Sequence, residues 1–305
     1  MSDKRSFTIA GRRITDDSPS YVIAECSHNH QGSHDLAREM FRVAKECGAD
    51  AVKLQKRSVG FYAALREKGL TEYADLREKR ELDEEDYLYL LEYARRLNLA
   101  FIVTAFDVES LDFLNGIGVD AIKLASGGLY NNQLLDAAMF NRCPLLISSG
   151  CCDWITLLHV MERTIGRYGH YRDQDRIALL QCTSAYPCPS DAMHLLTIDT
   201  YRRDYPATVV GLSSHHQGNY LEPVAYALGA RIFEKHFTLS RDLGPGDHAN
   251  SLDPAGLREL VANLRAVEAA MGDGVKRFLP CEEEGRKRLD VTYNPTAQVA
   301  QAMAV

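Results

Sequence analysis

The chain alternates between short apolar runs and longer segments with helical spacing, and this alternation limits the fold more than any other feature of the sequence. The runs are nearly continuously apolar, which is typical of strands buried on both faces of a parallel sheet. Each run is followed by a segment with helical spacing, and several of these segments end in glycine, a common helix stop. Eight runs follow this pattern, at residues 21–25, 50–55, 100–105, 120–126, 144–149, 177–184, 208–213 and 231–237.

Two architectures of the α/β class contain such strand–helix units. An open, doubly wound sheet that binds a dinucleotide needs a G-x-G-x-x-G turn after its first strand, and the sequence has none there. A closed barrel needs eight units over roughly 250 residues, and the chain provides both. The sequence therefore predicts a single-domain (β/α)8 TIM barrel.

Three segments fall outside the eight units. FTIAGRRI (7–14) predicts a short N-terminal β-hairpin that closes the bottom of the barrel. Residues 56–82 form a long, charged loop after the second strand, and its place on the active-site face makes it either a lid or a solvated excursion. The barrel domain is expected over residues 1–280, followed by a C-terminal tail over residues 281–305 that carries no further domain.

Composition excludes several classes of function. The 305 residues carry a net charge of -7 with Lys and Arg dispersed, whereas nucleic-acid binding requires a basic face. No apolar run reaches the length of a membrane span, and the N-terminus has no signal-peptide pattern. The eight cysteines form no CxxC pair and are too dilute for a disulfide scaffold. A reduced, cytoplasmic protein is expected.

Polar side chains stand at the C-terminal ends of the predicted strands, where barrel enzymes place their active sites. Lys53 and Lys123 lie within apolar strands, where an unpaired ammonium group would be costly. Lysines among hydroxyl groups indicate an anionic substrate, a phosphate or a carboxylate. For any single hydroxyl, a purely structural hydrogen bond is an equally good interpretation. The polar strand-end residues include Glu25, Lys53, Gln55, Thr104, Lys123, Ser126, Ser148 and Ser213.

His215 and His236 end the last two predicted strands, so their rings are expected to converge. Two imidazoles with positions left for water and substrate suit a divalent first-row metal that acts as a Lewis acid. Loop histidines that only form hydrogen bonds are the alternative. His216 should point away, because neighbouring strand residues face opposite sides. Asp247, in a Gly/Pro-rich loop, either contacts a hydroxylated substrate or belongs to a tight turn.

A series of motifs resembles the sialic acid synthase family. IAECSHNHQGS (23–33) is similar to the family's IAExxxNHxGS. The similarity extends from about Tyr21 to about Arg288, nearly the whole chain. The other motifs occur in the family's order and spacing: ADAVKLQ, TAFDVESLDFL, AIKLASG, ISSG, CTSAYP, GLSSH, GARIFEKHFTL and GPGDHANSLDP.

The resemblance implies a metal-dependent transferase that condenses phosphoenolpyruvate (PEP) with a sugar aldehyde, giving a 2-keto-3-deoxy sugar acid and phosphate. Mn²⁺ is the expected metal, with Mg²⁺ and Co²⁺ as alternatives, and His215 and His236 match the family's metal ligands. Glu25 matches the carboxylate near the reacting carbonyl and the attacking water. The PEP-binding positions are matched by Lys53, Thr104, Lys123, Ser126, Ser148 and Ser213, and the sugar-contacting positions by Gln55, Tyr186 and Asp247.

The sequence departs from the family's pattern mainly in the half that recognises the sugar. Gly128 stands where the family has an acidic residue after Ser-Gly, and Ser184 and Ser214 replace a usual Asn and Asp. The family's small C-terminal antifreeze-like domain is not expected, because the chain stops near its start. The PEP half of the site is therefore the better matched, and the acceptor is expected to differ from the usual N-acyl hexosamine.

Two other functions stay open. One is a different metal-dependent aldolase or lyase acting on a phosphorylated or carboxylated substrate. The other is a non-catalytic barrel that binds a sugar. The family's dimers form through the C-terminal domain that is not expected here, so a homodimer is an open expectation.

Overall fold

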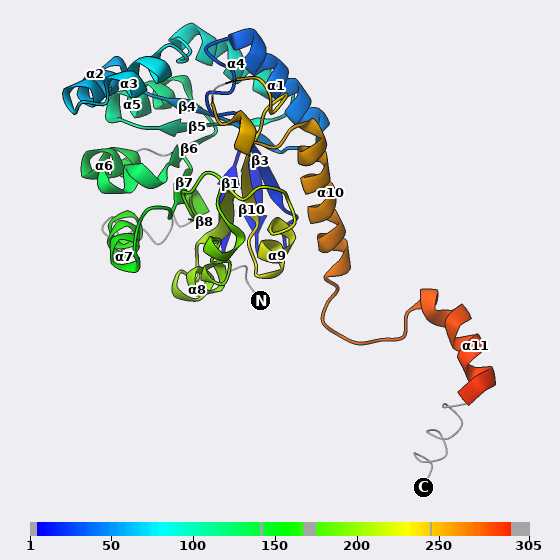
Figure 1. The fold of residues 1–305 in the computed structure, drawn as a ribbon. Helices are drawn as coiled ribbons and strands as arrows, with labels where there is room; N and C mark the ends of the chain where they lie inside the picture. The colour runs from blue at the N-terminus through cyan, green and yellow to red at the C-terminus, as the bar shows by residue number, and fades with distance from the viewer. Residues whose placement is uncertain (1–4, 141–142, 167–174, 245, 294–305) are drawn as a thin grey trace. The chain divides into compact units, whose positions relative to one another are not determined.

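The computed structural model describes residues 5–140, 143–166, 175–244 and 246–293. Its centre is a closed barrel of eight parallel strands that follow one another in chain order, with the last strand paired to the first (Figure 1). The predicted (β/α)8 barrel is therefore confirmed. The strands are β3 Tyr21–Glu25, β4 Ala51–Lys56, β5 Ala100–Ala105, β6 Ala121–Leu124, β7 Leu145–Ser148, β8 Ile177–Cys182, β9 Val209–Ser214 and β10 Ile232–His236.

Helices surround the barrel, and the local sequence explains where several of them begin and end. The Asp83 and Asp107 side chains accept hydrogen bonds from backbone N–H groups three residues on, which satisfies one unpaired donor of the first helical turn. Gly118 ends α5 with a φ of 74°, a left-handed conformation that glycine adopts without strain. The helices are α1 His34–Glu46, α4 Glu84–Arg96, α5 Val108–Ile117, α6 Asn132–Phe140, α7 Trp154–Met161, α8 Thr197–Asp204, α9 Glu222–Ala227 and α10 Pro254–Ala270.

An antiparallel hairpin of β1 (Ser6–Ile9) and β2 (Arg12–Thr15) precedes the barrel, as predicted. Its buried apolar side chains, Phe7, Ile9 and Ile14, belong to one core cluster with residues of the barrel interior such as Ile23 and Ile102. Apolar burial of this kind stabilises a fold by roughly 25 cal/mol per Å² removed from water. The hairpin thus fills the end of the barrel opposite the polar strand ends.

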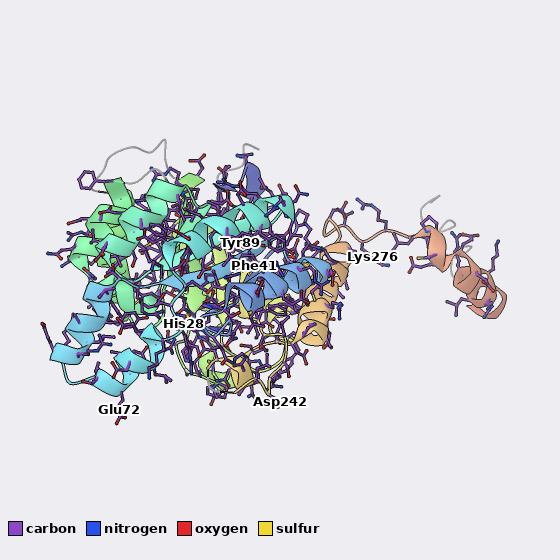
Figure 2. The ribbon with its side chains drawn as sticks, turned by 90° about the horizontal axis from the view of Figure 1, so that it is seen from above. His28, Phe41, Glu72, Tyr89, Asp242 and Lys276 are labelled. Carbon is purple, nitrogen blue, oxygen red and sulfur yellow. The ribbon has the colours of Figure 1, made fainter. Side chains whose placement is uncertain are left out.

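The segment over residues 56–82, predicted as a loop, contains two helices, α2 (Val59–Glu67) and α3 (Thr71–Glu78). The Ser58 hydroxyl accepts from Phe61 N and so caps α2, a local signal that the charged composition had masked. Figure 2 shows Glu72 at the outer edge of this excursion and His28 closer to the barrel. We refer to α2 and α3 together as the helical excursion.

The chain divides into two compact units, residues 1–268 and residues 269–305. The described part of the second unit begins in the last turn of α10 and contains a short 3-10 turn, Pro280–Glu282, and α11, Glu283–Tyr293. The predicted domain boundary at residue 280 stays a prediction. Among the described residues, no helix combines the length and the apolar character that a membrane span requires.

Gly211, within β9, is a position where the barrel leaves no room for a side chain. A Cβ there would lie 2.4 Å from both the Ile232 carbonyl oxygen and a Leu180 methyl group. We expect Gly211→Ala to lower the free energy of unfolding by about 1–3 kcal/mol, the usual effect of overpacking a core.

Chemical denaturation measures this difference. Gly116→Ala is the matched control, because Gly116 lies in α5 and a Cβ added to it would meet no described atom within 4 Å. Alanine at that helical position should stabilise slightly. Equal effects of the two substitutions would contradict the prediction.

Candidate active site

A cavity of about 480 Å³ opens at the C-terminal ends of the barrel strands. The parallel register brings the strand-end residues together, because it pairs Glu25 with both Lys53 and His236, and Thr104 with Lys123. All twelve residues predicted for the site line this one cavity: Glu25, Lys53, Gln55, Thr104, Lys123, Ser126, Ser148, Tyr186, Ser213, His215, His236 and Asp247.

Buried charges are paired at the base of this cavity. Lys123 Nζ contacts both oxygens of Glu234, at 2.9 and 2.8 Å. Lys53 Nζ lies 2.8 Å from Glu25 Oε2 and 3.7 Å from Glu234 Oε1, and it donates to Thr104 Oγ1 at 2.8 Å. Ser213 Oγ also donates to Glu234 at 3.1 Å. Two ammonium groups therefore share one central carboxylate, Glu234.

The pKa of Glu234 shows which interaction dominates in this cluster. Burial alone would raise it, but Lys123 and Lys53 outweigh burial and lower the pKa of Glu234 to about 2. Burial lowers the pKa of Lys123, assisted by the positive charge of Lys53. The two ammonium groups supply charged donors at this end of the cavity, the kind of group that binds phosphate or carboxylate.

Small hydroxyl groups form the wall next to the lysines. Ser148 Oγ is buried and has no hydrogen-bond partner among the described residues, so it is available to a ligand. Ser184 Oγ donates to Ser126 Oγ at 3.0 Å. A Cβ on Gly150 would lie 2.3 Å from Ser184 Oγ and 2.4 Å from Ser126 Oγ, so only glycine fits between them. This wall presents hydroxyl groups to the cavity without bulk.

Glu25 is held on two sides. Gln55 Nε2 donates to Glu25 Oε1 at 2.7 Å, and Lys53 lies against the other oxygen. Gln55 Nε2 also lies 3.1 Å from Ser27 Oγ, which donates to Asp247 Oδ2 at 2.6 Å. Glu25 is therefore a fixed carboxylate that faces the cavity, suited to orienting a water molecule or accepting a proton.

The imidazole rings of His215 and His236 converge, with centroids 5.4 Å apart, as the sequence predicted. His215 Nδ1 donates to the Thr183 carbonyl oxygen at 2.9 Å, so Nε2 is the ring nitrogen left for a ligand. Burial opposes a charged His215 ring, but Cys182 outweighs it and raises the pKa of His215. His236 Nδ1 is buried without a hydrogen-bond partner in the described part of the chain, and burial lowers the pKa of His236, which keeps its ring neutral. These properties fit metal ligation, although no group of three such side chains stands together in the described ranges.

His216 does not line the cavity. Its Nε2 lies 2.9 Å from Ser190 Oγ and 3.0 Å from Tyr220 OH, and the ring is buried. The two adjacent histidines therefore diverge, as strand alternation predicts. The Tyr186 ring, by contrast, lies over His215 with centroids 4.0 Å apart and so belongs to the cavity wall.

Several residues that line the cavity were missed by the sequence analysis. Glu234 carried a readable signal, because a carboxylate two residues before His236 in an apolar strand must face the same interior. Arg57, Tyr73 and Arg77 could not be placed, because they depend on how the helical excursion folds over the barrel. The missed residues include Arg57, Tyr73, Arg77, Phe106, Cys182 and Glu234.

The sequence of the chain is similar to that of a protein family and to those of several enzymes. The model of the NeuB family matches residues 40–276. N-acetylneuraminate-9-phosphate synthase from Homo sapiens is 33% identical over 289 residues, covering 92% of this chain and 79% of the human protein. N,N'-diacetyllegionaminic acid synthase from Legionella pneumophila is 34% identical over 268 residues, covering 84% of this chain and 74% of that protein.

The fold of the chain is also similar to that of a solved structure. The crystal structure of N-acetylneuraminic acid synthetase from Leptospira borgpetersenii, in complex with citrate, matches with a TM-score of 0.81 at 27% identity. The match covers 95% of this chain and 98% of the other.

Proposed function

Because the chain belongs to the NeuB family, we propose that it is a transferase that condenses phosphoenolpyruvate with a sugar aldehyde, giving a 2-keto-3-deoxy sugar acid and phosphate. The observation that carries the proposal is the juxtaposition of an anion-binding cluster, Lys53 and Lys123 around Glu234, with two converging imidazoles in one cavity. A substrate with a phosphate and a carboxylate fits the anion-binding cluster. A carbonyl acceptor fits the pair of imidazoles.

PEP would be bound by the buried lysines and the small hydroxyl groups of the wall. The unpartnered Ser148 hydroxyl and the Thr104 hydroxyl, which accepts from Lys53, supply further donors within the described cavity. Ser126 and Ser213 line the same wall, and Ser213 would donate to PEP by turning its hydroxyl away from Glu234. Such fixed donors are already oriented before the substrate arrives, so little reorganisation accompanies the reaction. Orientation of the two reactants supplies a further part of the rate.

His215 and His236 would hold a divalent metal, which supplies Lewis-acid polarisation of the acceptor carbonyl. The relatives' family is generally metal-dependent, and we propose Mn²⁺ as the metal, with Mg²⁺ and Co²⁺ as alternatives.

The proposed reaction joins PEP to the aldehyde, adds water and releases phosphate. A bond forms between C3 of PEP and the aldehyde carbon as the π bonds of PEP and of the aldehyde break, and the aldehyde oxygen takes a proton from solvent. Positive charge develops at C2 of PEP, where a water molecule adds and loses its proton to Glu25, which Gln55 and Lys53 hold in place. The bond between C2 and the phosphate oxygen breaks, the C2 hydroxyl passes its remaining proton to the departing phosphate, and C2 becomes the ketone.

The acceptor is proposed only as a class. Gln55, Tyr186 and Asp247 would contact it, and Gly128 offers no carboxylate at the position where the family usually has an acidic residue. Arg77 lines the cavity and has no ion-pair partner within the described part of the chain. A screen should therefore include hexosamine acceptors with and without a phosphate group.

We also propose a cytoplasmic location, which the eight free cysteines support. We propose that the barrel domain spans residues 1–280. A homodimer is the assembly that we propose to test.

Phosphate release tests the proposed function. With purified protein, PEP, Mn²⁺ and a panel of aldoses, we expect phosphate to appear only when PEP and an acceptor are both present. Cleavage of a sugar acid in the absence of PEP would indicate an aldolase or lyase instead. Binding of a sugar with no turnover of PEP on any acceptor would favour the non-catalytic barrel.

A further inference from the structure

Arg57 is buried at the base of the helical excursion, where β4 passes into α2. Its guanidinium group stacks on the Phe106 ring, 3.7 Å from the centroid, and the side chain is only 3% exposed. Arg57 Nη2 donates to Gln55 Oε1 at 2.8 Å. Arg57 Nη1 lies 3.2 Å from His28 Nε2 and 3.5 Å from Glu81 Oε1. The ring and these polar contacts hold the guanidinium plane in one orientation.

Gln55 connects Arg57 to the carboxylate of Glu25 in a chain of hydrogen bonds. Because a guanidinium group can only donate, the Gln55 oxygen must face Arg57. The Gln55 amide nitrogen must then face the other way, toward Glu25 Oε1 at 2.7 Å and Ser27 Oγ at 3.1 Å. A flipped amide would place its oxygen against the Glu25 carboxylate and its NH₂ group against the guanidinium, and both contacts would be repulsive.

Glu81 keeps Arg57 in place. The carboxylate accepts a hydrogen bond from Tyr62 OH of α2 and lies near Arg57 and His28. Interactions with His28, Tyr62 and Arg57 together lower the pKa of Glu81 although burial opposes this, so the carboxylate stays charged and its attraction for the guanidinium group persists.

We propose that Arg57 is a positioning residue for the condensation, which fixes the side-chain amide of Gln55 with its NH₂ group toward Glu25 and thereby sets the orientation of that carboxylate. The inference rests on the proposed function, because Glu25 is the group that receives the proton there. In this role Arg57 contacts neither PEP nor the aldehyde, and it acts only through Gln55.

A double-mutant cycle of Arg57→Met and Gln55→Met tests the inference. Methionine keeps the apolar stem over Phe106 and removes the donors. We expect Arg57→Met to lower kcat by about 10- to 100-fold, as loss of an orienting partner typically does. KM for PEP should change less than about twofold, since Arg57 reaches the site through Gln55 and not through the lysines of the anion-binding cluster. The double variant should have the kcat of Gln55→Met alone, because Arg57 has nothing left to position.

Arg66→Met is the matched control. Arg66 lies in the same excursion and pairs with Asp75 and Glu78, but it is outside the cavity, so kcat should be unchanged. Effects of Arg57→Met and Gln55→Met that multiply in the double variant would overturn the inference, because Arg57 would then act directly or through the fold. Thermal midpoints of all variants identify a loss that comes from unfolding.

A crystal structure of Arg57→Met gives a readout that does not depend on turnover. The Gln55 side chain should leave Glu25, and an unmoved Gln55 would overturn the inference whatever the activity. If the wild-type protein shows no PEP-dependent turnover, the proposed function fails, whereas active wild type with an additive cycle removes only the role of Arg57.

Discussion

Replacing His215 with alanine is expected to lower metal-dependent turnover by at least about 10³-fold. A Lewis-acid metal contributes several kcal/mol to the transition state, and each 1.36 kcal/mol corresponds to about tenfold in rate. With one of two imidazoles removed, His236 alone would not retain the ion, and the same loss is expected for His236→Ala. Phosphate release measures the activity, and calorimetric titration with Mn²⁺ measures metal binding separately.

His216→Thr is the control that makes this result specific. His216 is adjacent in sequence and equally buried, but its ring lies against Ser190 and Tyr220 outside the cavity. The variant should therefore keep most of the turnover and bind Mn²⁺ as the wild type does. Metal binding that survives in His215→Ala, or that is lost equally in His216→Thr, would contradict the assignment of the ligands.

Replacing Lys123 with methionine is expected to damage both PEP binding and stability. The substitution leaves Lys53, 3.7 Å away, as the nearest ammonium group to the buried Glu234, and breaking a buried ion pair destabilises a protein by about 3–5 kcal/mol. It also removes a charged donor to the anion, worth about 1.5–3 kcal/mol, so KM for PEP should rise roughly 10- to 100-fold.

Lys235→Met separates the two effects. Lys235 is a buried lysine of β10 that pairs with Glu222 at 2.8 Å, but it does not line the cavity. Its loss should lower the free energy of unfolding by a similar amount while KM for PEP stays near the wild-type value. Denaturation curves and initial-rate kinetics on both variants provide the comparison, and an equal rise in KM would rule out a specific role of Lys123.

The sequence predicted the barrel and most of the cavity because both depend on strict local rules. Strands buried on both faces are nearly continuous in apolar residues, so the few polar ones in them, such as Lys53 and Lys123, stand out as inward-facing and functional. Parallel strands in register then bring their C-terminal ends to one place. Alternation predicted that His215 and His216 diverge, and the position of His236 at the end of the next strand indicated that His215 is the inward one.

The fold of the helical excursion could not be predicted from such rules. Its charged residues have no apolar periodicity, and the sequence analysis read residues 56–82 as a loop, although Ser58 caps a helix there. Arg57, Tyr73 and Arg77 reach the cavity only through the path this segment takes over the barrel. Glu234 differs from these residues, because alternation places it on the same side of its strand as His236, and only its pairing with two lysines from other strands required the structure.

The pairing of β10 with β3 joins the last strand of the barrel to the first, and it places His236 beside Glu25. Until β10 is in position, Lys123 has no Glu234 to neutralise it, and the two histidines are not together. A nascent chain that lacks this strand would therefore leave Lys123 without its carboxylate partner, whereas Lys53 would still have Glu25. Formation of the site during synthesis in this way waits for the last strand of the barrel, although α10 and the residues beyond it are still to follow.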